Sequence, residues 1–95
     1  MFTLNPSPKF VRQLAKLTKK NNLLKDCISV VLKTMRNDPF FESLKTRKVL
    51  ITDRSYWSSR VSGDLRIIWN FNQNQIKIIN LYNIGGHTGQ NKVYK

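Results

Sequence analysis

Acidic residues, cysteine, histidine and long apolar runs are all scarce in this sequence. Five Asp and Glu stand against seventeen Lys and Arg, so the 95 residues carry a formal net charge of +12. For solubility alone, a small domain needs a net charge of a magnitude of only about 2–8. Because an excess of one sign repels itself in a folded protein, it favours a partner of opposite charge, namely nucleic acid, an anionic membrane or an acidic protein. The alternative is a cationic surface without a partner.

The missing residue types exclude several chemistries. Cys27 has no second cysteine to pair with, and it falls in an apolar helical stripe, so we expect a small buried side chain. One cysteine and one histidine far apart cannot complete a zinc site, so we expect no metal and no cofactor. No segment approaches the about 18 apolar residues of a membrane-spanning helix. The first six residues lack the order of a signal peptide, and we expect a cytoplasmic protein.

Helical periodicity dominates the first 40 residues. Ser7 followed by Pro8 predicts a helix start, because the hydroxyl can accept from free amides and proline has no amide to lose. Apolar residues then recur at helical spacing until Asn21-Asn22 interrupts them. A second apolar stripe follows and ends at Asp38-Pro39. The pattern predicts a helical hairpin with basic residues on its outer faces.

The period of the apolar residues changes to two after residue 48. Lys48–Thr52 and Tyr56–Val61 are predicted strands, and the turn Ser62–Asp64 leads into a third, Leu65–Phe71. Gln75–Ile84 is mostly apolar, which is typical of the central strand of a sheet. Together with a short alternating segment at residues 2–4, the order predicts one α+β domain. The helical hairpin would pack on a four- to five-stranded, mainly antiparallel sheet.

Polar side chains are expected to gather at one end of this sheet. A hairpin that turns at Ser62–Asp64 would bring Arg60 and Arg66 together, and like charges repel unless an anion such as phosphate lies between them. The alternative is that Arg60 is simply exposed and that Arg66 pairs with Asp64 or Asp53. No nucleotide-binding glycine loop and no nucleophilic serine motif accompanies these residues.

Several short motifs, in their order and spacing, resemble the RelE/ParE superfamily, and within it the RelE/StbE, YafQ-like branch. These proteins are toxins of type II toxin–antitoxin systems. The matching segments are Asn37–Phe40, Ser43–Lys48, Trp57-Ser58, Asp64–Trp69, Leu81, Ile84–His87 and Val93-Tyr94. Since they span nearly the whole chain, the resemblance implies a single RelE-like toxin domain over residues 1–95, in a bacterial or archaeal cytoplasm.

The resemblance also implies an activity. Members of this branch cleave mRNA within a translating ribosome, without a metal ion, and an acidic antitoxin silences them. The toxin is expected to be a monomer within that complex. By resemblance, Arg66 would stabilise the phosphate, Asp64 and His87 would take part in catalysis, and Tyr94 would orient or stack on a base.

The chain departs from the family pattern at two places. Arg47 stands where relatives often carry a histidine, and the step from His87 to Tyr94 is longer than usual. Because His87 is the only side chain whose ordinary pKa lies near neutrality, a two-histidine mechanism is excluded. We therefore expect chemistry that depends mainly on electrostatic stabilisation of the phosphate. The residues expected to contact RNA or phosphate are Arg60, Arg47, Lys48, Trp57 and Lys92, with Trp57 alternatively a packed residue of the sheet.

Two other functions remain open. A ParE-like inhibitor of DNA gyrase would keep the same fold, although that branch does not depend on a closing histidine and tyrosine, which His87 and Tyr94 provide here. A non-catalytic nucleic-acid-binding module would use the basic charge equally well. A membrane-surface role is the least favoured, because each predicted helix has a core to cover.

Overall fold

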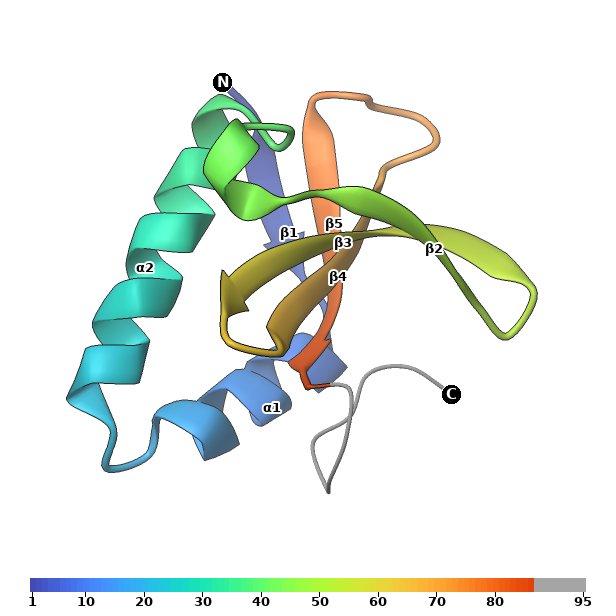
Figure 1. Ribbon diagram of the computed structural model, residues 1–95. Coiled ribbons are helices and arrows are strands. Elements are labelled where there is room, and N and C mark those ends of the chain that lie inside the picture. Colours follow the sequence, from blue (N-terminus) through green and yellow to red (C-terminus); the bar gives the residue numbers. More distant parts are fainter. Residues whose placement is uncertain (87–95) are drawn as a thin grey trace.

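The structure is a computed structural model, and it describes residues 1–86. Along the chain, one strand is followed by two α-helices and then by four further strands. The strands form one five-stranded mixed sheet (Figure 1). Their bounds are β1 Thr3–Pro6, α1 Pro8–Thr18, α2 Asn22–Asn37, β2 Arg47–Ile51, β3 Arg54–Ser62, β4 Leu65–Phe71 and β5 Ile78–Gly85, with a short 3-10 helix at Glu42–Leu44 before β2. This arrangement confirms the predicted α+β class. Within residues 1–86, neither α-helix is long and apolar enough to cross a membrane.

Both α-helices begin where a side chain can accept from their free amides. Ser7 Oγ accepts from the backbone N–H of Phe10 at 3.0 Å, and Asn21 Oδ1 accepts from that of Leu24 at 3.0 Å. A cap of this kind stabilises a helix by about 1 kcal/mol. Helix α2 ends at Asn37, two residues before a proline. The predicted helix boundaries are therefore confirmed.

The sheet has the strand order β1-β5-β4-β3-β2, so β4 is its central strand. Strands β2 to β5 pair antiparallel, and β1 pairs parallel with β5, with Thr3 opposite Ile78. The prediction that the last strand is central was wrong, because β5 lies between β1 and β4. Its apolar composition arises because both of its edges are paired and its residues Ile79, Leu81 and Ile84 are buried.

The main core lies between the helices and one face of the sheet. Helix α2 runs alongside the sheet, and α1 follows β1 in the chain (Figure 1). Phe10 of α1 and three residues of α2 pack against β4 and β5, and burial of each such side chain contributes about 1.5–3 kcal/mol. The fully or nearly buried members are Phe10, Ile28, Val31, Met35, Leu44, Ile67, Trp69, Ile79, Leu81 and Ile84. Cys27 is half-buried rather than fully buried, and its Sγ donates to the carbonyl oxygen of Val61 at 3.7 Å.

One polar group in this core is fully buried and hydrogen-bonded. Ser59 Oγ on β3 accepts from the indole Nε1 of Trp69 at 2.8 Å, and it lies 2.7 Å from the hydroxyl of Thr46. Ser59 and Trp69 are both completely shielded from solvent. The bonds therefore allow a tryptophan to occupy the centre of the core without leaving its N–H unpaired.

The opposite face of the sheet is covered by neither helix, and we call it the open face. Alternation along β3 and β4 directs to it Arg54, Tyr56, Ser58, Arg60, Arg66 and Ile68. A smaller apolar cluster lies there, formed by Ile51, Tyr56 and Ile68 with Val49 and Tyr82 packed against it. The open face is thus a mixed surface of aromatic and basic side chains.

Candidate functional site

Arg60 and Arg66 lie directly opposite each other on the open face. The register of the β3–β4 hairpin pairs the two residues, and Arg66 is in turn opposite Gly85 on β5. Directly opposed residues have Cβ atoms about 4.5–5.5 Å apart, so the two side chains start as neighbours. The prediction that this hairpin brings both arginines together is confirmed.

The guanidinium group of Arg66 is only partly satisfied. Its Nε and Nη1 atoms are buried, and neither has a hydrogen-bond partner within residues 1–86. Neither atom therefore pairs with Asp64 or Asp53, which was the alternative expected from the sequence. Buried N–H groups without an acceptor are costly, and the cost is larger for a charged group. An anion that accepted from these donors would remove that cost and also reduce the repulsion between Arg66 and the exposed Arg60.

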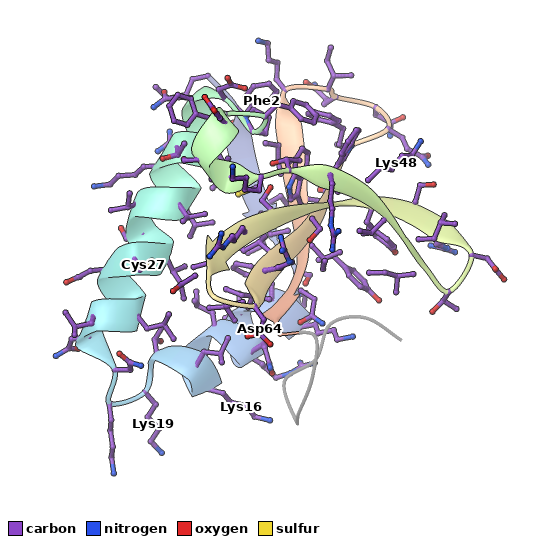
Figure 2. All side chains as sticks on the ribbon, in the orientation of Figure 1. Phe2, Lys16, Lys19, Cys27, Lys48 and Asp64 are labelled. Atoms are coloured by element: carbon purple, nitrogen blue, oxygen red, sulfur yellow. The ribbon has the colours of Figure 1, made fainter. Side chains whose placement is uncertain are left out.

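Asp64 lies in the turn after β3, beside the end of β5. A methyl group added at Gly86 would come within 2.9 Å of Asp64 Oδ2, so the carboxylate lies against the backbone of Gly86. Figure 2 shows Asp64 at this end of the sheet. Gly63 supplies the positive φ of +54° that the turn requires. The predicted residues His87, Lys92 and Tyr94 lie outside the described residues, and His87 follows Gly86 directly in the sequence.

Arg47 also lies on the open face, on the edge strand β2. It pairs with Ser58 of β3, which pairs with Ile68 of β4, which pairs with Asn83 of β5. This row crosses β3 at Ser58, which is two residues from Arg60 along the strand. Two residues of a strand correspond to about 7 Å. The structure therefore places three arginines on one face, from three adjacent strands.

Lys48 and Trp57 are not part of this group. They pair with each other, and alternation turns both toward the helix side of the sheet. Trp57 packs edge-on against Phe40, with ring centres 4.9 Å apart, and stacks with Trp69 at 6.1 Å. The adjacent residues Arg47 and Lys48 were both predicted as phosphate contacts, but neighbours on a strand point to opposite faces.

Sequence reasoning missed two tyrosines on the open face. The rings of Tyr56 and Tyr82 stack with centres 4.9 Å apart and planes inclined by 22°. The β4–β5 register shifts between Ile68, which pairs with Asn83, and Trp69, which pairs with Leu81. This β-bulge leaves Tyr82 as the extra residue and directs it to the open face. In the sequence of β5, the polar residues Asn80 and Asn83 are three positions apart, an odd interval that a regular strand with one polar face would not have.

Both layers carry positive charge. Lys16 of α1 and Lys19 just after it extend away from the sheet (Figure 2), whereas the arginines of β2, β3 and β4 lie together on the open face. Residues 1–86 contain no group of three His, Cys, Asp or Glu side chains that could hold a metal ion. What the described part of the open face offers is therefore a cationic surface with an incompletely bonded guanidinium at one end. Such a surface can bind a phosphate and stabilise added negative charge on it.

No protein-family model and no curated protein sequence matches this chain. Several solved structures do match. A metal-bound toxin from Helicobacter pylori is 22% identical, with a TM-score of 0.73 over 92% of this chain and 96% of that one. YafQ from E. coli strain BL21(DE3) is 16% identical, with a TM-score of 0.69 over 90% and 93%. The YoeB–YefM toxin–antitoxin complex from Staphylococcus aureus is 16% identical, with a TM-score of 0.70 over 93% and 99%. The chain therefore has the RelE-like α+β fold of the YoeB- and YafQ-type toxins.

Proposed function

We propose that this chain is the toxin of a type II toxin–antitoxin pair, an endoribonuclease that cuts mRNA on the ribosome without a metal ion and so inhibits translation. The observation that carries the proposal is the Arg60–Arg66 pair. Two buried N–H donors of Arg66 lack an acceptor among the described residues, on the sheet face that neither helix covers, in a fold that known toxins share. A backbone phosphate of RNA is the anion that such a site fits best.

The arrangement supports an internal transfer reaction. The ribose 2′-hydroxyl attacks the adjacent phosphorus, the bond to the 5′-oxygen of the next nucleotide breaks, and a cyclic phosphate remains. Negative charge grows on the phosphate oxygens in the transition state, where Arg66 and Arg60 would stabilise it. Arg47, one row away, would hold a neighbouring phosphate.

Proton transfer is assigned to residues at and beyond the end of β5. The 2′-hydroxyl must lose a proton and the leaving 5′-oxygen must gain one, and His87 is the proposed carrier. Asp64, whose carboxylate lies against Gly86, is the second candidate. Tyr94 is proposed to stack on or orient a base, and Lys92 to contact phosphate.

The proposed partner is a small acidic antitoxin. The net charge of +12 would be neutralised by such a protein, and the matching YoeB structure was solved as a toxin–antitoxin complex with YefM. Ribosomal RNA, which is also a polyanion, would use the same excess charge when the antitoxin is absent. We propose that the toxin is a monomer within that complex.

Arg66→Ala tests the nuclease proposal. Growth arrest after induced expression and the appearance of new 3′ ends on mRNA in a translation extract should both be lost. Removal of a single oxyanion-stabilising donor commonly reduces kcat by about 10²–10³-fold. Arg12→Ala, an exposed arginine on α1, is the matched control and should keep both activities.

Three results would contradict the proposal. Full activity of Arg66→Ala would remove the site assignment. Inhibition of DNA supercoiling by the wild-type chain, with no new mRNA ends, would favour a gyrase inhibitor instead. RNA binding with neither effect would favour a non-catalytic binding module.

A further inference from the structure

We propose that the open face carries a second nucleotide subsite, formed by Tyr82, Tyr56 and Arg54 at the end of β3 opposite to Arg60. The inference rests on the proposed function, because it assigns a further part of the same RNA strand to the same face. Its ligand is an unpaired nucleotide of single-stranded RNA, whose base stacks on the tyrosine pair and whose phosphate binds Arg54.

The tyrosine pair provides an aromatic surface outside the main core. Tyr56 packs on one side of the Tyr82 ring, and the two rings join only a small apolar cluster on the open face. Lys9 Nζ lies 5.2 Å from the centre of the Tyr82 ring. Tyr82 is half-buried, so part of its ring surface is accessible. A base could displace the flexible Lys9 side chain from Tyr82, and the ammonium group would then be free to meet a phosphate.

Two cavities adjoin the tyrosine pair and share Arg54 and Tyr56 as walls. One, of about 330 Å³, is lined by Ile51, Thr52, Arg54, Tyr56 and Tyr82. The other, of about 410 Å³, is lined by Arg54, Ser55, Tyr56, Asn70 and Gln73. An aromatic wall suits a base, the exposed guanidinium suits a phosphate, and the amides of Asn70 and Gln73 can hydrogen-bond to base edges.

The charges around these cavities favour a polyanion. Arg54 lines both cavities, and Lys9 lies over the ring of Tyr82, which lines one of them. The acidic residue of the adjoining turn, Asp53, is exposed. An acidic peptide would also be attracted by these cations. It would make no use of a stacked aromatic pair, however, so the combination favours RNA.

Spacing along β3 connects the two ends of the open face. Tyr56 and Arg60 are four residues apart on one strand, which corresponds to about 13 Å. A stacked nucleic-acid strand places one phosphate about every 3.4 Å, so about four nucleotides would span this interval. A single RNA strand lying along β3 could therefore have one phosphate at Arg60 and Arg66 while a flanking base lies on Tyr82.

The test measures binding of a single-stranded RNA of about twelve nucleotides, well above the about four that span the face. Its 2′-hydroxyls are methylated so that it cannot be cleaved, and binding is followed by fluorescence anisotropy without ribosomes. Tyr82→Leu should weaken binding about tenfold, since stacking of one base is commonly equivalent to a factor of this order. Arg54→Ala should also weaken binding and reduce the salt dependence by about one phosphate contact.

Matched controls separate the subsite from general effects. Phe41→Leu likewise replaces an aromatic ring with leucine, and Arg12→Ala repeats the change made at Arg54, both at exposed positions away from the open face. Both variants should bind like the wild type. Tyr82→Phe keeps the ring and should also bind like the wild type, which guards against misfolding as the cause of a loss. An RNA duplex of equal length offers no unpaired base, so Tyr82→Leu should leave duplex binding unchanged.

Three results would overturn the subsite. The first is that Tyr82→Leu and Arg54→Ala bind the single strand as tightly as the controls do. The second is that Tyr82→Leu loses as much affinity for the duplex as for the single strand. The third is that Tyr82→Leu loses as much affinity for an acidic peptide of the same charge. The nuclease proposal fails separately. If Arg66→Ala kept full toxicity while the two subsite variants lost RNA binding, the subsite would stand. If Arg66→Ala abolished toxicity and the subsite variants bound normally, the subsite alone would be refuted.

Discussion

Arg60 and Arg66 illustrate a conflict between stability and binding at the level of single residues. Like charges placed directly opposite on neighbouring strands destabilise a sheet, and the buried donors of Arg66 that lack an acceptor within residues 1–86 add to the cost. A surface that only needed to be soluble would gain from replacing one of the two arginines. Their arrangement is what a phosphate-binding site requires before its ligand arrives.

Arg60→Gln should therefore stabilise the free protein while weakening its activity. Relief of the repulsion should raise the free energy of unfolding by up to about 1 kcal/mol, measured by urea denaturation. New mRNA 3′ ends should decrease in the translation extract. Arg12→Gln should change neither quantity, and a lower unfolding free energy for Arg60→Gln would contradict the argument.

Ser59 provides a second residue-level prediction, in the core. Replacing it with alanine removes the acceptor of the Trp69 indole N–H and the neighbour of the Thr46 hydroxyl. Because the indole N–H would then be buried without a partner, Ser59→Ala should lower the free energy of unfolding by about 1–3 kcal/mol. Ser55→Ala, an exposed serine on the same strand, should stay within about 0.5 kcal/mol of the wild type.

The strained element of the fold is the turn between β2 and β3. Thr52 and Asp53 both have positive φ, +50° and +64°. Two consecutive residues with positive φ are typical of a type I′ hairpin turn, for which Asn-Gly is the preferred sequence. A β-branched threonine is a poor choice at such a position.

The double change Thr52→Asn, Asp53→Gly should relieve this strain. We expect the thermal unfolding midpoint to rise, with a gain of about 1 kcal/mol in stability. Gly63→Ala, at the other hairpin turn with φ +54°, should have the opposite effect and serves as the comparison. An unchanged midpoint in the double variant would show that the turn is not strained.

At the level of elements, local signals were sufficient for most of the fold. Caps and prolines mark the helix ends, and period-two segments with turn residues mark β2, β3 and β4. They could not give the position of β5 in the sheet, because strand order depends on tertiary pairing. The bulge at Tyr82 was missed as well, although Asn80 and Asn83 of β5 lie three residues apart, an interval that a regular period of two does not produce.

The candidate site was predictable to the same extent. The Arg60–Arg66 pair follows from a hairpin with a recognisable turn, so the sequence was sufficient. Lys48 was grouped with its sequence neighbour Arg47, and Trp57 was predicted to stack on a base, whereas the strand register turns both to the other face. Tyr56, Tyr82 and Arg54 come together only when three strands are placed side by side.

At the level of the whole molecule, charge position should matter more than net charge. RNA affinity should fall as salt increases, with a slope of about −0.7 for each phosphate neutralised on a single strand. Arg60→Ala should reduce the slope by about that amount. Lys19→Ala, just after α1 and directed away from the sheet, should leave the slope unchanged (Figure 2). Equal effects of both changes would mean that RNA binds without preference for the open face.

The parallel pairing of β1 with β5 affects the order of events during synthesis. Asn5 and Asn80, whose side chains bond across this pair at 3.1 Å, are 75 residues apart in the chain. Strand β1 is made first and has no strand partner until β5 has been made. Contacts between such distant residues form slowly, because loop closure must precede them. The row that joins Arg60, Arg66 and Gly85 also needs β5 in place. A chain that is still being translated would therefore lack the complete open face until β5 has been made.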